Sequence, residues 1–215
     1  MKFLTSSISL VFVNLLPILG AIFLGWDINT LLLIYWSENV VVGIFTVLKM
    51  LKVENIFDKN NKYKIEVIKP QTDPANEKDR KGSYLGAFLF TYGIFCLIHG
   101  IILLTIASES SLNIFGLFLN VVISFVLLFI SHLVSYKTNY IDKEEYKNTS
   151  VVELFIRSFK RIFIIQFTMV ILFFALRGTD NFVGVTLMVI IKIIADLIGH
   201  RSEHMTIKRV TFTLD

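Results

Sequence analysis

The chain has 215 residues, of which 54% are hydrophobic and only 18% are charged. Soluble domains usually carry about 25% charged residues, and a soluble fold of this size could not bury so much apolar surface. The composition therefore excludes an ordinary water-soluble domain, and we expect the lipid bilayer to cover the excess. The net charge of +4 does not indicate a nucleic-acid partner, because the basic residues flank apolar segments, as in membrane proteins.

Six apolar segments approach or exceed the length of about 20 residues that a transmembrane helix needs. In chain order they cover about 4–25, 29–50, 84–107, 113–135, 158–176 and 181–200. The first segment is longer than the hydrophobic region of a signal peptide, so we expect it to remain as a span. The pattern predicts an all-α protein, a polytopic transmembrane helix bundle with six spans in a single membrane domain.

Positive charge is divided unequally between two groups of connections. The N-terminus, the polar loop 51–82, the connection after 135 with its flanks, and the C-terminal tail hold 19 of the 21 lysines and arginines. Cytoplasmic loops are the basic ones. We therefore expect both termini and the loop on the cytoplasmic side of the inner (cytoplasmic) membrane. The loop is polar and contains prolines, which is typical of a loosely ordered segment.

Four glycines of the third segment, Gly82, Gly86, Gly93 and Gly100, share one helical stripe. Small residues at this spacing let helices approach closely in lipid. The stripe predicts a packing seam, and a conduit lined by bare backbone is the alternative.

A first group of polar residues lies near the middle of the predicted spans. Ionisable groups there cost about 2.5–3.5 kcal/mol on insertion scales and indicate a site. Glu38 and Lys192 fall close to the centres of their segments, and pairing is the simplest way to accommodate both charges. The pair would either fix the helix register or form a protonatable or substrate-binding site. The members of this midplane site are Glu38, Asn39, Tyr92, His99 and Lys192.

A second group lies near the predicted cytoplasmic face. Its members are His132, Arg161, Asp196, His200 and His204, and the last three follow at intervals of four on one helix face. The string from His200 to His204 matches the H-x-x-E-H pattern of certain zinc peptidases. We expect His132 to converge with Asp196 or His200. A divalent metal held by His132, Asp196, His200 and His204 is one interpretation, and interfacial residues on the positive side are the other.

Several strings together resemble a family of prokaryotic multi-pass membrane proteins catalogued only as a domain of unknown function. The most specific are Tyr35-Trp36-Ser37-Glu38-Asn39 and Tyr92-Gly93-Ile94-Phe95-Cys96-Leu97-Ile98-His99-Gly100, joined by Gly25-Trp26-Asp27, Ser131-His132, Arg161-Ile162 and the stretch from Lys192 to His204. The resemblance implies six spans and no known activity. This chain departs from the family pattern at Ser158-Phe159, where a Pro-Tyr pair is expected, and at Gln166, where a histidine is expected. The second departure weakens the metal interpretation.

The function predicted from these patterns is that of an integral membrane protein with a polar intramembrane site. Three classes compete for its activity. A small transporter or ion-coupled carrier would use Glu38, His99 and Lys192, and a metal-dependent enzyme would use the histidine and aspartate layer. A structural or partner-binding subunit would use the polar residues for packing alone. Homo-oligomers, other protein partners, the substrate and the question whether the protein is an enzyme are left open by the sequence.

Overall fold

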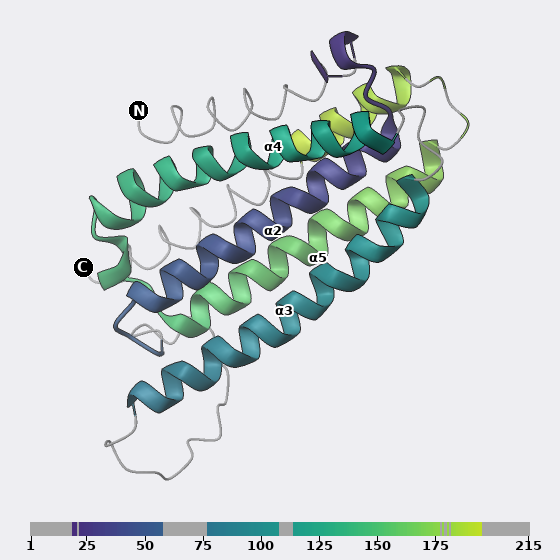
Figure 1. Cartoon of the computed structure of the whole chain (residues 1–215). Coiled ribbons are helices and arrows are strands. Elements are labelled where there is room, and N and C mark those ends of the chain that lie inside the picture. Colours follow the sequence, from purple (N-terminus) through teal and green to yellow (C-terminus); the bar gives the residue numbers. More distant parts are fainter. Residues whose placement is uncertain are drawn as a thin grey trace, which may run out of the picture. The chain divides into compact units, whose positions relative to one another are not determined.

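A computed structural model describes residues 19–20, 22–57, 77–107, 114–176, 178, 180 and 182–194 (Figure 1). The named elements are α2 (Ile28–Lys52), α3 (Glu77–Ala107), α4 (Ile114–Ser135), the π-helical turn η2 (Tyr136–Ile141), the 3-10 turn η3 (Glu145–Lys147) and α5 (Val151–Leu176). A shorter apolar helix covers Phe182–Ile194. The predicted all-helical fold is thus confirmed for the described residues. The first predicted span, about 4–25, lies almost wholly outside them.

Four helices are long and apolar enough to cross a membrane. They cover Ile28–Lys52, Asp79–Thr105, Phe115–Ile141 and Val151–Ala175. They correspond to the second through fifth predicted spans, about 29–50, 84–107, 113–135 and 158–176. Length and composition therefore indicate a membrane protein.

The predicted helix boundaries differ most at the polar connections. Residues 77–82, which were assigned to the loop, form the first turns of α3, and α2 continues to Lys52. Helix α5 begins at Val151, well before the predicted start at 158. Charged residues in these turns lowered the local hydropathy without preventing helix formation, because a helix can continue beyond the apolar part of a span.

The chain forms two compact units, and each is described by itself. One contains Met1–Leu32, Ile106–Leu117 and Arg161–Asp215, and the other contains Leu33–Thr105 and Phe118–Lys160. We call the second one the α2–α4 unit, because it holds most of α2, α3 and α4 and the start of α5.

Helix α2 lies at the centre of the α2–α4 unit. It contacts α3 through Trp36, α4 through Phe45 and the first turns of α5 through Thr46. The apolar window of α2 is 61% buried, against 11–27% for those of the other three long helices. Most of α2 is therefore a packing surface, whereas α3, α4 and α5 keep wide apolar faces exposed.

Beyond the end of α2, short contacts join its connection to those of the other helices. The backbone amides of Val151 and Val152 donate to the carbonyls of Asn55 (3.0 Å) and Ile56 (3.2 Å). Lys81 Nζ donates to the carbonyls of Leu51 (2.8 Å) and Val53 (2.5 Å). An ammonium is well placed there, because the last carbonyls of a helix lack partners and carry partial negative charge.

In the other unit, the string Gly25-Trp26-Asp27 forms the start of α2. Gly25 has a φ of 68°, which favours glycine. Asp27 Oδ1 accepts hydrogen bonds from the Thr30 amide (2.8 Å) and the Thr30 hydroxyl (2.6 Å). This is an ordinary N-cap, so the role of Asp27 in the structure is to begin the helix.

Candidate functional site

The most specific strings of the sequence meet at the interface between α2 and α3. The indole Nε1–H of Trp36 donates to the carbonyl oxygen of Cys96 at 2.8 Å. The same ring lies on Gly100, where an added Cβ would come within 2.6 Å of Trp36 Cζ2. A side chain at position 100 would therefore displace the indole. Trp36 thus acts as a packing residue whose polar atom is satisfied by the neighbouring helix.

Tyr92 makes the reciprocal contact from α3 to α2. Its hydroxyl donates to the carbonyl oxygen of Asn39 at 2.9 Å, and its ring lies on Gly43. An added Cβ at Gly43 would come within 2.5 Å of Tyr92 Cε1. The ring also stacks on Phe88, with centroids 4.8 Å apart. Each helix therefore places one aromatic ring on a glycine of the other, which holds the two backbones close together.

Of the four glycines in the predicted seam, Gly100 has a close contact with another helix, and for the other three the seam stays a prediction. Among the described residues nothing lies within 4 Å of a Cβ added at Gly82, Gly86 or Gly93, and only Gly100 makes the close contact. The second glycine of the interface is Gly43, which lies on α2 and was not part of the stripe. A shared stripe on one helix could not reveal which of its glycines meets a ring of another helix.

Glu38 lies on a different face of α2 from the one that packs against α3. It precedes Phe45 by seven residues, so these two side chains share a face. Phe45 contacts the rings of Phe129 (5.2 Å) and His132 (5.8 Å) on α4. Glu38 is half-buried on this α4-facing side. The Trp-x-Glu-Asn string therefore divides into packing residues, Trp36 and Asn39, and a carboxylate directed elsewhere.

The other two midplane residues are separated from Asn39 and Tyr92. The His99 ring lies against that of Phe95 on its own helix, with centroids 4.0 Å apart and a tilt of 31°, and its Nδ1 is 2.9 Å from the Phe95 carbonyl. Lys192 is 1% exposed in the helix Phe182–Ile194 and belongs to the other compact unit. The predicted Glu38–Lys192 pair therefore stays a prediction. Of the five midplane residues, the α2–α3 interface brings together Asn39 and Tyr92.

The second predicted group lies only partly within the described residues. His132 is half-buried near the end of α4, with its ring stacked on Phe45 at an angle of 26°. Arg161 lies in α5, in the other unit. Asp196, His200 and His204 lie outside the described residues, and the convergence with His132 stays a prediction. Within the described ranges no three histidine, cysteine or carboxylate side chains cluster as metal ligands.

Tyrosines and lysines form a layer at this end of the unit that the sequence interpretation missed. The π-helical turn η2 extends α4 and carries Tyr136 and Tyr140, whose rings stack at 5.7 Å. The Tyr140 hydroxyl donates to the Lys49 carbonyl at 3.0 Å, and the Lys49 ammonium lies 5.3 Å from the Tyr140 ring centroid. π-helical turns are rare and often occur at functional sites.

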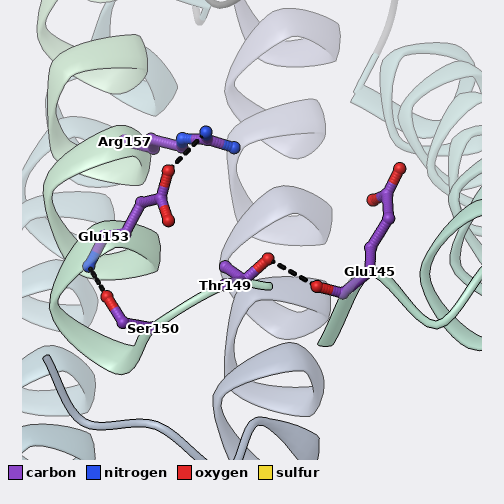
Figure 2. A network of polar contacts seen from close by, with 5 residues as sticks. All are labelled: Glu145, Thr149, Ser150, Glu153 and Arg157. Carbon is purple, nitrogen blue, oxygen red and sulfur yellow. Dashed lines mark hydrogen bonds and ion pairs between the residues drawn. The ribbon is translucent and has the colours of Figure 1, made fainter. Parts of the chain in front are cut away.

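A neighbouring network fixes the start of α5 (Figure 2). The Ser150 hydroxyl accepts a hydrogen bond from the Glu153 amide at 3.1 Å, and the Glu153 carboxylate pairs with Arg157 at 2.5 Å. Serine followed three residues later by glutamate is the sequence signature of a capping box, and it could have located this helix start. In the structure the Glu153 side chain forms an ion pair one turn further along the helix.

Glu153 is buried, so the loss of Arg157 as its ion-pair partner would reduce the stability of the protein more than the loss of a partner in a solvent-exposed pair. By contrast, Lys147 pairs with Glu144 at 2.6 Å in the exposed turn η3. The hydrogen bond that the Lys147 ammonium donates to the Glu144 carboxylate raises the pKa of Lys147, which is charged at neutral pH in any case. The Lys147 pair is therefore a solvated contact of little structural consequence.

Comparison with known proteins gives a family without an activity. A family model described as "Family of unknown function (DUF6498)" matches residues 2–211. No curated protein and no solved structure matches the chain.

Proposed function

The chain belongs to the Family of unknown function (DUF6498), and we propose that it is a small ion-coupled carrier of the cytoplasmic membrane, whose polar intramembrane site is centred on Glu38. The observation that supports this proposal is that the residues from Trp36 to Asn39 are divided between two faces of α2. Trp36 and the Asn39 carbonyl serve the contact with α3, whereas helix periodicity puts Glu38 on the face of Phe45, which contacts α4.

A charged side chain in the middle of a spanning helix is costly, and such residues are a functional-site hypothesis by default. The α2–α3 interface already satisfies its polar groups through Trp36 and Tyr92. A role for Glu38 in binding or releasing an ion accounts for its presence. The buried ammonium of Lys192 supplies a second ionisable group inside an apolar helix.

The proposal includes six spans with both termini in the cytoplasm. It is supported by the four apolar helices and by the division of the basic residues between the two sides. Alkaline extraction of native membranes should leave the protein in the pellet. Single cysteines at Lys59, Glu109 and Asp215, in a Cys96→Ala background, should differ in reactivity toward an impermeant thiol reagent. In intact cells only the cysteine at 109 should react, and labelling at 59 would contradict the topology.

Transport is tested with the purified full-length protein in liposomes. Imposed gradients of H⁺, Na⁺ or K⁺, each followed with an ion-selective dye, should dissipate faster than in empty vesicles. Glu38→Gln should remove the difference, whereas Glu54→Gln, a substitution at an exposed carboxylate beyond α2, should retain it. Rates equal to those of empty vesicles for all three ions would count against a carrier of these cations.

A purely structural subunit is the second candidate, and one observation favours it. The residues of the most specific strings that the structure places in contact, Trp36 with Cys96 and Tyr92 with Asn39, join helices. In that case Glu38→Gln would leave every flux unchanged, and its effect would appear only in stability or in co-purification with a partner.

A further inference from the structure

The contact between α2 and α4 joins the helix that carries Glu38, a member of the midplane group, to the helix that carries His132, a member of the cytoplasmic-side group. We call this contact the α2–α4 seam. Its contacts join Phe45 and Lys49 of α2 to Phe129, His132, Tyr136 and Tyr140 of α4 and η2, and Glu38 falls on the same face of α2 as Phe45. All of them belong to the same compact unit.

Phe45 occupies the middle of the seam. Its side chain is 3% exposed, and its ring centroid lies 5.2 Å from that of Phe129, 5.8 Å from His132 and 5.9 Å from Tyr136. The contact of His132 with Phe45 is a stacked one. The ring of Phe45 is therefore enclosed by aromatic side chains on the α4 side.

The ring contacts also determine the register of the two helices. Phe45 meets residues 129–136, and Lys49, one turn further along α2, lies against Tyr140, so the helices run parallel. Glu38 precedes Phe45 by seven residues, which is about 10 Å along the axis.

Two ionisable groups therefore face one seam: the Phe45 ring lies against the His132 imidazole, and Glu38 falls about 10 Å further toward the N-terminal end of α2. We propose that the α2–α4 seam is a proton route in which the Phe45 ring is the barrier between Glu38 and His132. The inference rests on the proposed ion-coupled function and identifies the ion as H⁺. His132 takes up a proton from the cytoplasmic side at one ring nitrogen. When the Phe45 ring moves aside and water enters the seam, an N–H bond of His132 breaks and an O–H bond forms on the Glu38 carboxylate, the proton passing along the intervening water molecules.

The remaining titratable groups of the seam lie on the His132 side of the barrier. Tyr136 and Tyr140 offer hydroxyl groups, and the Lys49 ammonium lies over the Tyr140 ring. The ion pair of Glu153 with Arg157 belongs to the neighbouring start of α5, and Tyr140 interacts electrostatically with Glu153 and Glu145. The seam is thus polar on the side toward the cytoplasm and apolar at Phe45.

Accessibility of position 38 tests the barrier without requiring any transport. Glu38→Cys is introduced into full-length Cys96→Ala protein, and inside-out membrane vesicles are treated with a membrane-impermeant methanethiosulfonate. With Phe45 present the thiol should react slowly. Phe45→Ala should raise the rate by roughly tenfold or more, since a buried site is otherwise reached only through local opening. Phe45→Leu, which keeps an apolar side chain, should remain slow and serves where Phe45→Ala misfolds.

Ile44→Ala is the matched control, because Ile44 is the exposed neighbour of Phe45 on the same helix. It should leave the thiol at position 38 protected. Equal rates at position 38 with phenylalanine, leucine and alanine at position 45 would overturn the barrier. Faster labelling in Phe45→Ala without ion flux in the wild-type protein would instead refute the carrier and retain the barrier.

A proton-leak measurement tests the role of His132. Liposomes with the Phe45→Ala protein should dissipate a pH gradient faster than those with the wild type, and adding His132→Gln or Glu38→Gln should reverse this. A leak that neither substitution alters would overturn the proton route.

Discussion

The indole of Trp36 and the backbone of Gly100 are in direct contact, while the Trp36 Nε1–H donates to the carbonyl of Cys96 at 2.8 Å. This contact explains why tryptophan occurs in the middle of an apolar helix, where interfacial residues are not expected. Its large ring fills the space that the missing side chain leaves, and its polar atom has a partner.

Gly100→Ala should destabilise the protein, by about 1–3 kcal/mol, because the added Cβ cannot coexist with the present position of the indole. Thermal unfolding in detergent, followed by circular dichroism, measures the effect. Gly93→Ala is the matched control on the same helix, where the structure shows open space. It should be neutral or slightly stabilising, since alanine favours helix over glycine. Equal losses for both substitutions would contradict the assigned contact.

Tyr92→Phe tests the other half of the interface. The ring remains on Gly43, and only the hydrogen bond to the Asn39 carbonyl is lost. The free energy of unfolding should fall by about 0.5–1.5 kcal/mol, the usual net value of one hydrogen bond. Tyr84→Phe, a less buried tyrosine of the same helix, provides the comparison. A loss as large as that of Tyr92→Ala would mean that the ring is displaced as well.

Ser150→Ala should weaken the start of α5. The Glu153 amide would lose its acceptor, at a cost of about 1 kcal/mol. Ser150→Asp restores an acceptor of similar reach and should recover most of the loss. Hydrogen exchange of the amides in the first turn of α5 measures the effect locally, and unchanged exchange in Ser150→Ala would exclude the cap.

The predicted pair of Glu38 with Lys192 has its own test. If the charges pair, Glu38→Gln or Lys192→Met alone should destabilise the protein by about 3–5 kcal/mol, because one buried charge loses its partner. The double variant should recover much of that loss. Additive effects in chemical denaturation would show that the two side chains do not interact.

Metal content decides the remaining interpretation of the histidines. Zinc bound to the purified wild-type protein, and lost in both His132→Ala and His200→Ala, would support a metal centre. Zinc retained in both variants would separate these histidines from any metal.

The length of the apolar segments was sufficient to predict an all-helical fold with long apolar helices. Each such helix has to satisfy its backbone hydrogen bonds internally, so its length follows from the local sequence alone. The start of α5 also has a local signature, Ser150 followed three residues later by Glu153, which the length of the apolar segment does not reveal.

Only the tertiary structure decided which face of α2 meets which neighbour. In a soluble helix the apolar stripe marks the packed face, but α2 and α3 are apolar on all sides, and lipid is as apolar as a neighbouring helix. The sequence by itself therefore determined that Trp36, Glu38 and Gly100 lie in helices long enough to cross a membrane. The contact of Trp36 with Gly100, and the contact of Phe45 with the rings of α4, depend on close packing between residues far apart in the chain, which no local pattern records.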